Sequence, residues 1–195
     1  MGILIKEIIK MADNKTENFA KRGVKGILWW LAGEVICVIF NLCMLPFMMK
    51  FMAFKVFGAL ASIIIADGLF FNFAYNCAVK DRNLIKYHNV NQDKTMSLKM
   101  ALISPLPQYI MWIVLLLSKL GIIGDIFNVF ILSNMKTLAW VDLFTSGRTI
   151  EYLSWGGLFG LLALMLIAPA VIAVTYELTI RDIDVKAILL YGKKK

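Results

Sequence analysis

The chain has few of the residues from which catalytic and metal sites are usually built. Its 195 residues include one histidine, His88, and three cysteines, Cys37, Cys43 and Cys77. A lone histidine cannot form a metal centre or a catalytic triad by itself, and three cysteines without a CxxC spacing fit neither a disulfide framework nor a zinc site. We therefore expect no cofactor and no bound metal, and an enzymatic role is not favoured.

Charge is also scarce, at 17% of the residues, whereas hydrophobic residues make up 60%. A soluble domain is about 45–50% apolar by a similar count, so the excess here must be covered by lipid. The net charge of +8 comes from cations between and beside the apolar stretches, where they would face anionic headgroups. The expected partner is the lipid bilayer, and no nucleic acid is expected.

Long apolar stretches dominate what remains, and they predict an all-α integral membrane protein. The four predicted transmembrane helices cover residues 26–49, 56–79, 100–118 and 150–176. A further apolar piece, residues 126–132, is too short to cross a hydrocarbon core of about 30 Å. We expect it to be a surface or re-entrant segment that covers the bundle as a lid.

Polar, basic segments flank this transmembrane domain of residues 26–176. In residues 1–25, apolar side chains recur at helical spacing around Ile5 and Ile9, which predicts an amphipathic N-terminal helix at the membrane interface, followed by a basic linker. Residues 177–195 form a basic tail that ends in three lysines.

The distribution of Lys and Arg predicts the sidedness. Alternate segments carry sixteen of the cations on one side of the predicted membrane and five on the other. The positive-inside rule then puts both termini in the cytoplasm.

Seventeen lysines against four arginines are typical of an AT-rich genome, which favours a bacterial inner membrane.

Two carboxyl groups are predicted to lie at membrane depth. An ionisable side chain there costs roughly 2.5–3.5 kcal/mol on insertion scales and is a candidate for function. Glu34 and Asp67 lie in the first and second predicted spans. In an antiparallel hairpin, Asn72 would lie level with Glu34, and Asn41 within a turn of Asp67. These four residues predict a polar seam, which is either a proton or cation site or a set of hydrogen bonds that fixes helix register.

Small residues mark two helix faces suited to close packing. Gly58, Ser62 and Ala66 recur every four residues in the second span, and Gly156 and Gly160 are spaced as GxxxG in the fourth. Such faces favour helix association. They predict a homo-oligomer or a place in a larger membrane complex.

The sequence thus favours a small polytopic membrane protein that acts as a non-enzymatic subunit or accessory protein of a membrane complex. The alternative is a small transporter or transport component in which Glu34 and Asp67 couple protons or cations. An intramembrane enzyme is the third and least favoured class.

Overall fold

The computed structural model describes residues 19–88, 91, 93–145, 147, 149–183 and 188, and every element in this part of the chain is helical. The predicted interfacial helix near the N-terminus and the three terminal lysines lie outside the described residues.

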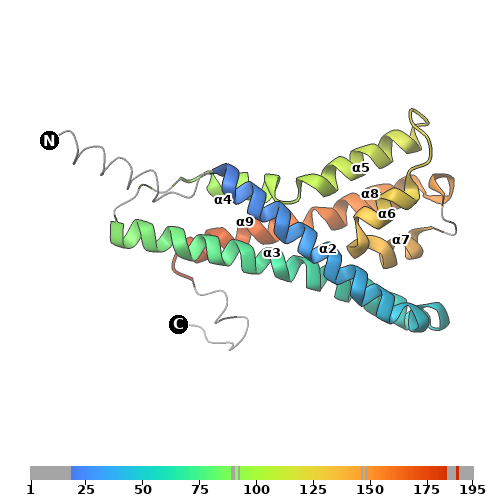
Figure 1. The fold of residues 1–195 in the computed structure, drawn as a ribbon, viewed down its shortest axis with the longest axis horizontal. Helices are drawn as coiled ribbons and strands as arrows, with labels where there is room; N and C mark the ends of the chain where they lie inside the picture. The colour runs from blue at the N-terminus through green and yellow to red at the C-terminus, as the bar shows by residue number, and fades with distance from the viewer. Residues whose placement is uncertain are drawn as a thin grey trace.

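Two long helices form an antiparallel hairpin that runs the length of the molecule (Figure 1). Helix α2 spans Phe19–Lys50 and helix α3 spans Met52–His88, with Phe51 between them. Helix α2 continues past Pro46 to Lys50, where the amide of Phe51 still donates to the carbonyl of Phe47 at 3.0 Å. Both helices are longer than the spans predicted from hydropathy, because polar residues continue the helix beyond the apolar core.

The third predicted span is a bent pair of helices. Helix α4 covers Met96–Ile103 and helix α5 covers Leu106–Lys119, with an angle of 50° between them. Pro105 lies at the break, and because its ring has no N–H and crowds the preceding turn, it interrupts the helix there.

The fourth predicted span is also interrupted. Helix α8 covers Trp155–Met165 and helix α9 covers Ile167–Ile180, with Leu166 between them. Pro169 cannot donate to the carbonyl of Met165, four residues earlier. The side-chain amide of Gln108 in α5 donates to that carbonyl instead, at 2.9 Å.

Between α5 and α8 the chain turns back into the bundle. This stretch contains α6 (Phe127–Ser133), the 3₁₀ turn η1 (Met135–Thr137), α7 (Leu138–Phe144) and a second 3₁₀ turn, η2 (Ile150–Tyr152). Figure 1 places α6 and α7 between the α2–α3 hairpin and the pair α5 and α8. The stretch enters and leaves at the same end of the bundle, and we call residues 126–144 the re-entrant segment.

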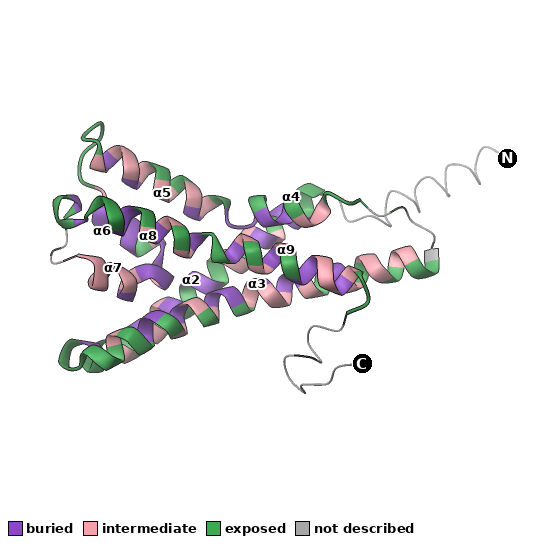
Figure 2. Ribbon diagram, turned by 180° about the vertical axis from the view of Figure 1, so that it is seen from behind, coloured by how far each residue is buried: buried purple, intermediate pink, exposed green. Residues whose placement is uncertain are grey.

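Burial follows this arrangement. Figure 2 shows buried residues on the inward faces of the helices and exposed residues on their outer faces. Large apolar side chains such as Leu28, Ile39 and Ile64 are more than half exposed, which suits helices that face lipid. The described residues contain three helices long and apolar enough to cross a membrane, or up to four if the bent pair α4 and α5 is one span. The chain therefore has the character of a multi-pass membrane protein.

Candidate functional site: a polar cluster in the bundle core

Glu34 lies midway along α2 and is 6% exposed. Its carboxylate accepts a hydrogen bond of 3.2 Å from the backbone amide of Lys136, in the turn η1. Sixteen residues separate Glu34 from the end of α2 at Lys50, which at about 1.5 Å per residue is roughly 24 Å. The tip of the re-entrant segment therefore reaches the middle of the bundle.

Lys136 brings a cation to the same place. Its side chain is 2% exposed, and its ammonium lies 3.9 Å from a carboxylate oxygen of Asp67 in α3. Asp67 is itself 6% exposed. The separation is longer than a hydrogen bond, so the ammonium and the carboxylate attract each other without either using its hydrogen-bonding capacity.

Amide and hydroxyl groups hold the turn η1 in position. The side chain of Asn41 donates to the carbonyl of Met135 at 2.9 Å and accepts a hydrogen bond of 3.3 Å from the hydroxyl of Ser62. One turn further along the segment, the indole of Trp140 donates to the carbonyl of Ala59 at 2.9 Å. These bonds join α2, α3 and the re-entrant segment. Irregular backbone is stable at membrane depth only when it is surrounded by protein in this way.

We call Glu34, Asn41, Ser62, Asp67 and Lys136 the core polar cluster. Three of the four residues predicted for the polar seam therefore lie in one place. Asn72 does not join them: it is partly exposed and accepts a hydrogen bond of 3.4 Å from Asn76, on its own helix. Asn41 lies beside Ser62, whereas it was expected within a turn of Asp67. The register of the hairpin therefore differs by about one helical turn from the expected one.

The small residues of α3 are used inside the chain. Gly58, Ser62 and Ala66 are all buried, and a side chain at Gly58 would meet the sulfur of Met48 at 3.1 Å. In α8, Gly160 lies near Phe144 of the re-entrant segment, whereas Gly156 is exposed.

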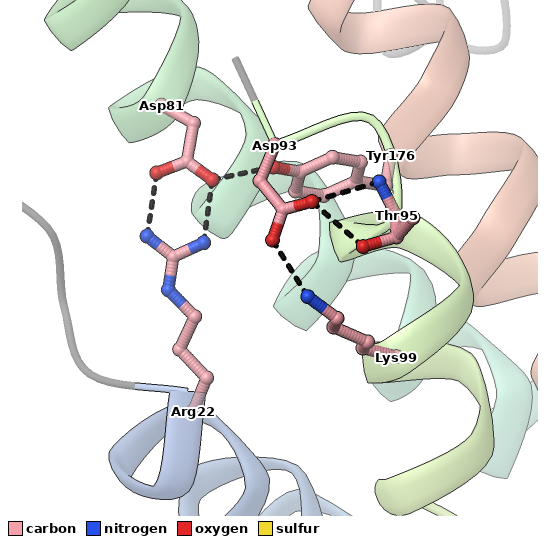
Figure 3. Close-up of polar contacts among 6 residues, drawn as sticks. All are labelled: Arg22, Asp81, Asp93, Thr95, Lys99 and Tyr176. Carbon is pink, nitrogen blue, oxygen red and sulfur yellow. Dashed lines mark hydrogen bonds and ion pairs between the residues drawn. The ribbon is translucent and has the colours of Figure 1, made fainter. Parts of the chain in front are cut away.

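A second buried ion pair lies at the end of the bundle where α2 begins (Figure 3). Arg22 donates two hydrogen bonds of 2.5 Å to the carboxylate of Asp81, and the hydroxyl of Tyr176 donates to the same carboxylate at 2.5 Å. Arg22 is 3% exposed. The bidentate pair and Tyr176 together join α2, α3 and α9, and a guanidinium held in this way acts as a structural clamp.

Sequence reasoning missed two of these charges. Lys136 was counted among the outer-loop cations, because the segment around it is too short to be a span. Asp81 is not conspicuous in the sequence, because it lies in a polar stretch at the predicted membrane edge. One available signal was electrostatic: ionised carboxyl groups at membrane depth need a cation nearby, and Lys136 lies in a mainly apolar stretch.

The described residues contain no group of three or more His, Cys, Asp or Glu side chains that could hold a metal ion. A comparison with known protein families, with characterised proteins and with solved structures finds no match to this chain.

Proposed function

We propose that this chain is a component of a membrane transport system and that Glu34, Asp67 and Lys136 form its proton- or cation-coupling site. The observation that carries the proposal is the burial of all three groups at the middle of the bundle. Ionisable side chains at membrane depth mark ion and proton pathways in general.

The charge balance explains why this site would exchange an ion. Two carboxylates and one ammonium sum to −1 when all three are ionised, and an uncompensated charge in a medium of low dielectric is costly. Binding of one proton or one monovalent cation removes that excess. The ion pair of 3.9 Å between Lys136 and Asp67 leaves both groups able to interact with such an ion.

The broken helices support the same function. Discontinuous helices next to a buried polar site are a common construction in secondary transporters. Here the breaks at Pro105 and Leu166 lie in helices that pack together, and the re-entrant segment contributes Lys136.

Ion flux into vesicles tests the proposal. Purified protein is reconstituted into liposomes, a pH gradient or a sodium gradient is imposed, and uptake is followed with a trapped pH or sodium indicator. We expect flux above that of protein-free vesicles. We also expect Asp67→Asn and Glu34→Gln to reduce it to the background level, because each removes one of the two groups that would bind the ion.

Glu151→Gln is the matched control, since it removes an exposed carboxyl of η2. It should leave the flux unchanged. Helical content and elution volume in detergent show whether each variant is folded. A folded Asp67→Asn, Glu34→Gln double variant with the flux of the unmodified protein would eliminate this proposal.

The role of a non-enzymatic subunit is a second proposal, and α8 favours it. Gly156 is exposed, a Cβ atom there would meet only the hydroxyl of Ser154 at 3.9 Å, and its neighbours Trp155 and Phe159 are exposed as well. This surface could receive a helix of another copy or of a different subunit. Gly156→Leu should then reduce crosslinking between chains in native membranes. Unchanged crosslinking, or none at all in the unmodified protein, would argue against this contact.

A further inference from the structure

Glu34 and Asp67 have different surroundings within the core polar cluster. The carboxylate of Glu34 accepts a hydrogen bond of 3.2 Å from the backbone amide of Lys136, so a donor already stabilises its negative charge. Asp67 is 6% exposed, and neither of its carboxylate oxygens accepts a hydrogen bond from any described residue. Buried carboxylates are normally hydrogen-bonded or paired closely with a cation. Asp67 therefore has more capacity to bind a cation than Glu34 has.

Lys136 is held in place through its backbone and not through its side chain. Glu34 binds its amide, and Asn41 binds the carbonyl of Met135 directly before it. The ammonium of Lys136, by contrast, has no hydrogen-bond partner among the described residues and lies 3.9 Å from Asp67. The same ammonium also attracts the carboxylate of Glu34. It can therefore move between the two carboxylates on its flexible four-carbon stem while the turn η1 stays in position.

The charge of the cluster favours a monovalent cation. Two carboxylates and one ammonium sum to −1, so one added positive charge makes the cluster neutral, whereas a divalent ion would leave an excess of +1. A protonated Asp67 would be a hydrogen-bond donor, and neither of its oxygens has a hydrogen-bond partner in the described part of the chain. An alkali cation instead uses such oxygen atoms as ligands. Asn134, which directly precedes η1, has a further buried side-chain oxygen without a donor.

We propose that a monovalent alkali cation binds at Asp67 and that Lys136 competes with it, so that the ammonium pairs with Glu34 when the cation is bound. This inference rests on the proposed ion coupling and divides the roles of the two carboxylates. Asp67 is the ligand of the ion, and Glu34 holds the ammonium that the ion displaces. Loss of either carboxylate weakens binding, Asp67 because the ligand is gone and Glu34 because the displaced ammonium has no partner.

Sodium binding tests the role of Lys136. The purified full chain in detergent is incubated with radioactive sodium at constant ionic strength, with choline as the replacement ion, and bound sodium is measured after rapid separation. We expect saturable binding by the unmodified protein. Lys136→Met should raise the affinity roughly tenfold or more, because it removes a nearby positive charge from a medium of low dielectric. Unchanged or lower affinity in the folded variant would overturn the role of competitor.

Two double variants of equal formal charge identify the ligand. Lys136→Met with Glu34→Gln keeps Asp67, whereas Lys136→Met with Asp67→Asn keeps Glu34. We expect both to fold even where the single variant does not, because removal of one carboxylate offsets the loss of the ammonium. The first should bind sodium and the second should not. Equal binding by the two, or binding by the second alone, would overturn the assignment of Asp67.

Failure of this inference differs from failure of the proposed transport. Flux into vesicles driven by a pH gradient, together with no sodium binding by the purified chain, would leave ion coupling in place and contradict the alkali cation. Sodium binding that follows the two double variants as expected, without flux into vesicles, would support the site and contradict transport. Displacement of bound sodium by choline or by calcium as effectively as by sodium itself would count against a site for a monovalent metal ion.

Discussion

Single residues decide whether the core polar cluster is stable. Lys136 is the one cation within the cluster among the described residues, and it is almost completely buried. A buried ion pair gains little over an apolar pair of the same shape, but the loss of one partner leaves the other uncompensated. The stability of the fold should therefore depend more on the presence of both charges, on Lys136 and on Asp67, than on either charge alone.

Lys136→Met should destabilise the protein by about 3–5 kcal/mol, because it leaves the two carboxyls of the cluster without their ammonium. Combining it with Asp67→Asn should recover a large part of that loss, because one of those two charges is then also removed. The measurement is the free energy of unfolding in mixed micelles. Additive effects of the two substitutions would show that the residues do not act as a pair.

Asp93, between α3 and α4, lies outside the core polar cluster and is hydrogen-bonded to Lys99 and Thr95 (Figure 3). Hydrogen bonds from the ammonium of Lys99 and from Thr95 lower its pKa to about 2. A depressed pKa means that this carboxylate contributes stability above its ordinary pKa of about 3.9, and that the contribution disappears as the pH falls toward 2.

Nuclear magnetic resonance titration of the Asp93 carboxyl carbon should give a midpoint near 2. Lys99→Gln should move the midpoint toward the ordinary value, since it removes the largest cause of the depression. A midpoint that does not respond to Lys99→Gln would exclude this ion pair as the cause.

The sequence was sufficient to find Glu34 and Asp67, because a carboxyl within an apolar stretch is conspicuous. It was not sufficient to find their cation, because Lys136 is separated from Asp67 by 69 positions and is placed by tertiary packing. Asn72 was misplaced for a related reason. The register of two long helices depends on close contacts such as Asn41 with Ser62, which no periodicity reveals.

At the scale of the elements, two helix breaks are stabilised by contacts from other helices. Gln108 donates to the carbonyl that Pro169 leaves without a partner, and the break at Ser104 lies directly against Gly26 of α2. Pro169 predicts a kink in the later half of the fourth span, whereas Pro105 and Pro107, near the start of the third span, predict no break there. The partners could not be predicted, since they come from helices distant in sequence.

Gln108→Leu should destabilise the protein by about 1–3 kcal/mol, because the carbonyl of Met165 would be buried without a donor. Pro169→Ala supplies a backbone N–H at the required position, so it should offset much of this cost in the double variant. Thermal unfolding of the two single variants and of the double variant measures the coupling. Equal destabilisation by Gln108→Leu with and without Pro169→Ala would contradict the assigned role of Gln108.

Gly26→Ala should destabilise the contact between α2 and the break at Ser104. A Cβ atom at Gly26 would lie 2.1 Å from the hydroxyl oxygen of Ser104 and 3.1 Å from its Cα atom. Overpacking of this kind costs about 1–3 kcal/mol. Gly68→Ala is the control, because nothing lies within 4 Å of its Cβ, and it should be neutral or stabilising by up to about 1 kcal/mol. Equal unfolding temperatures for the two variants would rule out the close contact.

For the molecule as a whole, the described helices define two ends. The turn between α2 and α3 and the loop after α5 lie at one end, and the beginning of α2 and the end of α9 lie at the other (Figure 1). Lys136, one of the five cations counted on the cation-poor side in the sequence, lies inside the bundle, so four of those five remain outside the core.

Site-directed labelling tests this arrangement in intact cells. In a background with Cys43→Ala, we expect Lys50→Cys and Ile123→Cys to react with a membrane-impermeant maleimide added outside. Asn91→Cys, at the opposite end, should react only after the cells are opened. Labelling of all three positions from the same side would refute a membrane-spanning bundle with these ends.

The re-entrant segment also constrains the order in which the protein assembles during its synthesis. The helices α6 and α7 have seven residues each and are too short to insert as independent spans, and Lys136 would enter hydrocarbon unaccompanied if it preceded its acceptors. The hairpin that carries Glu34 and Asp67 is made earlier and must therefore be in the bilayer first. Final closure of the bundle is then a late event in biogenesis, and a ribosome-bound chain that ends at residue 119 should expose an unfilled acidic cavity to the insertion machinery.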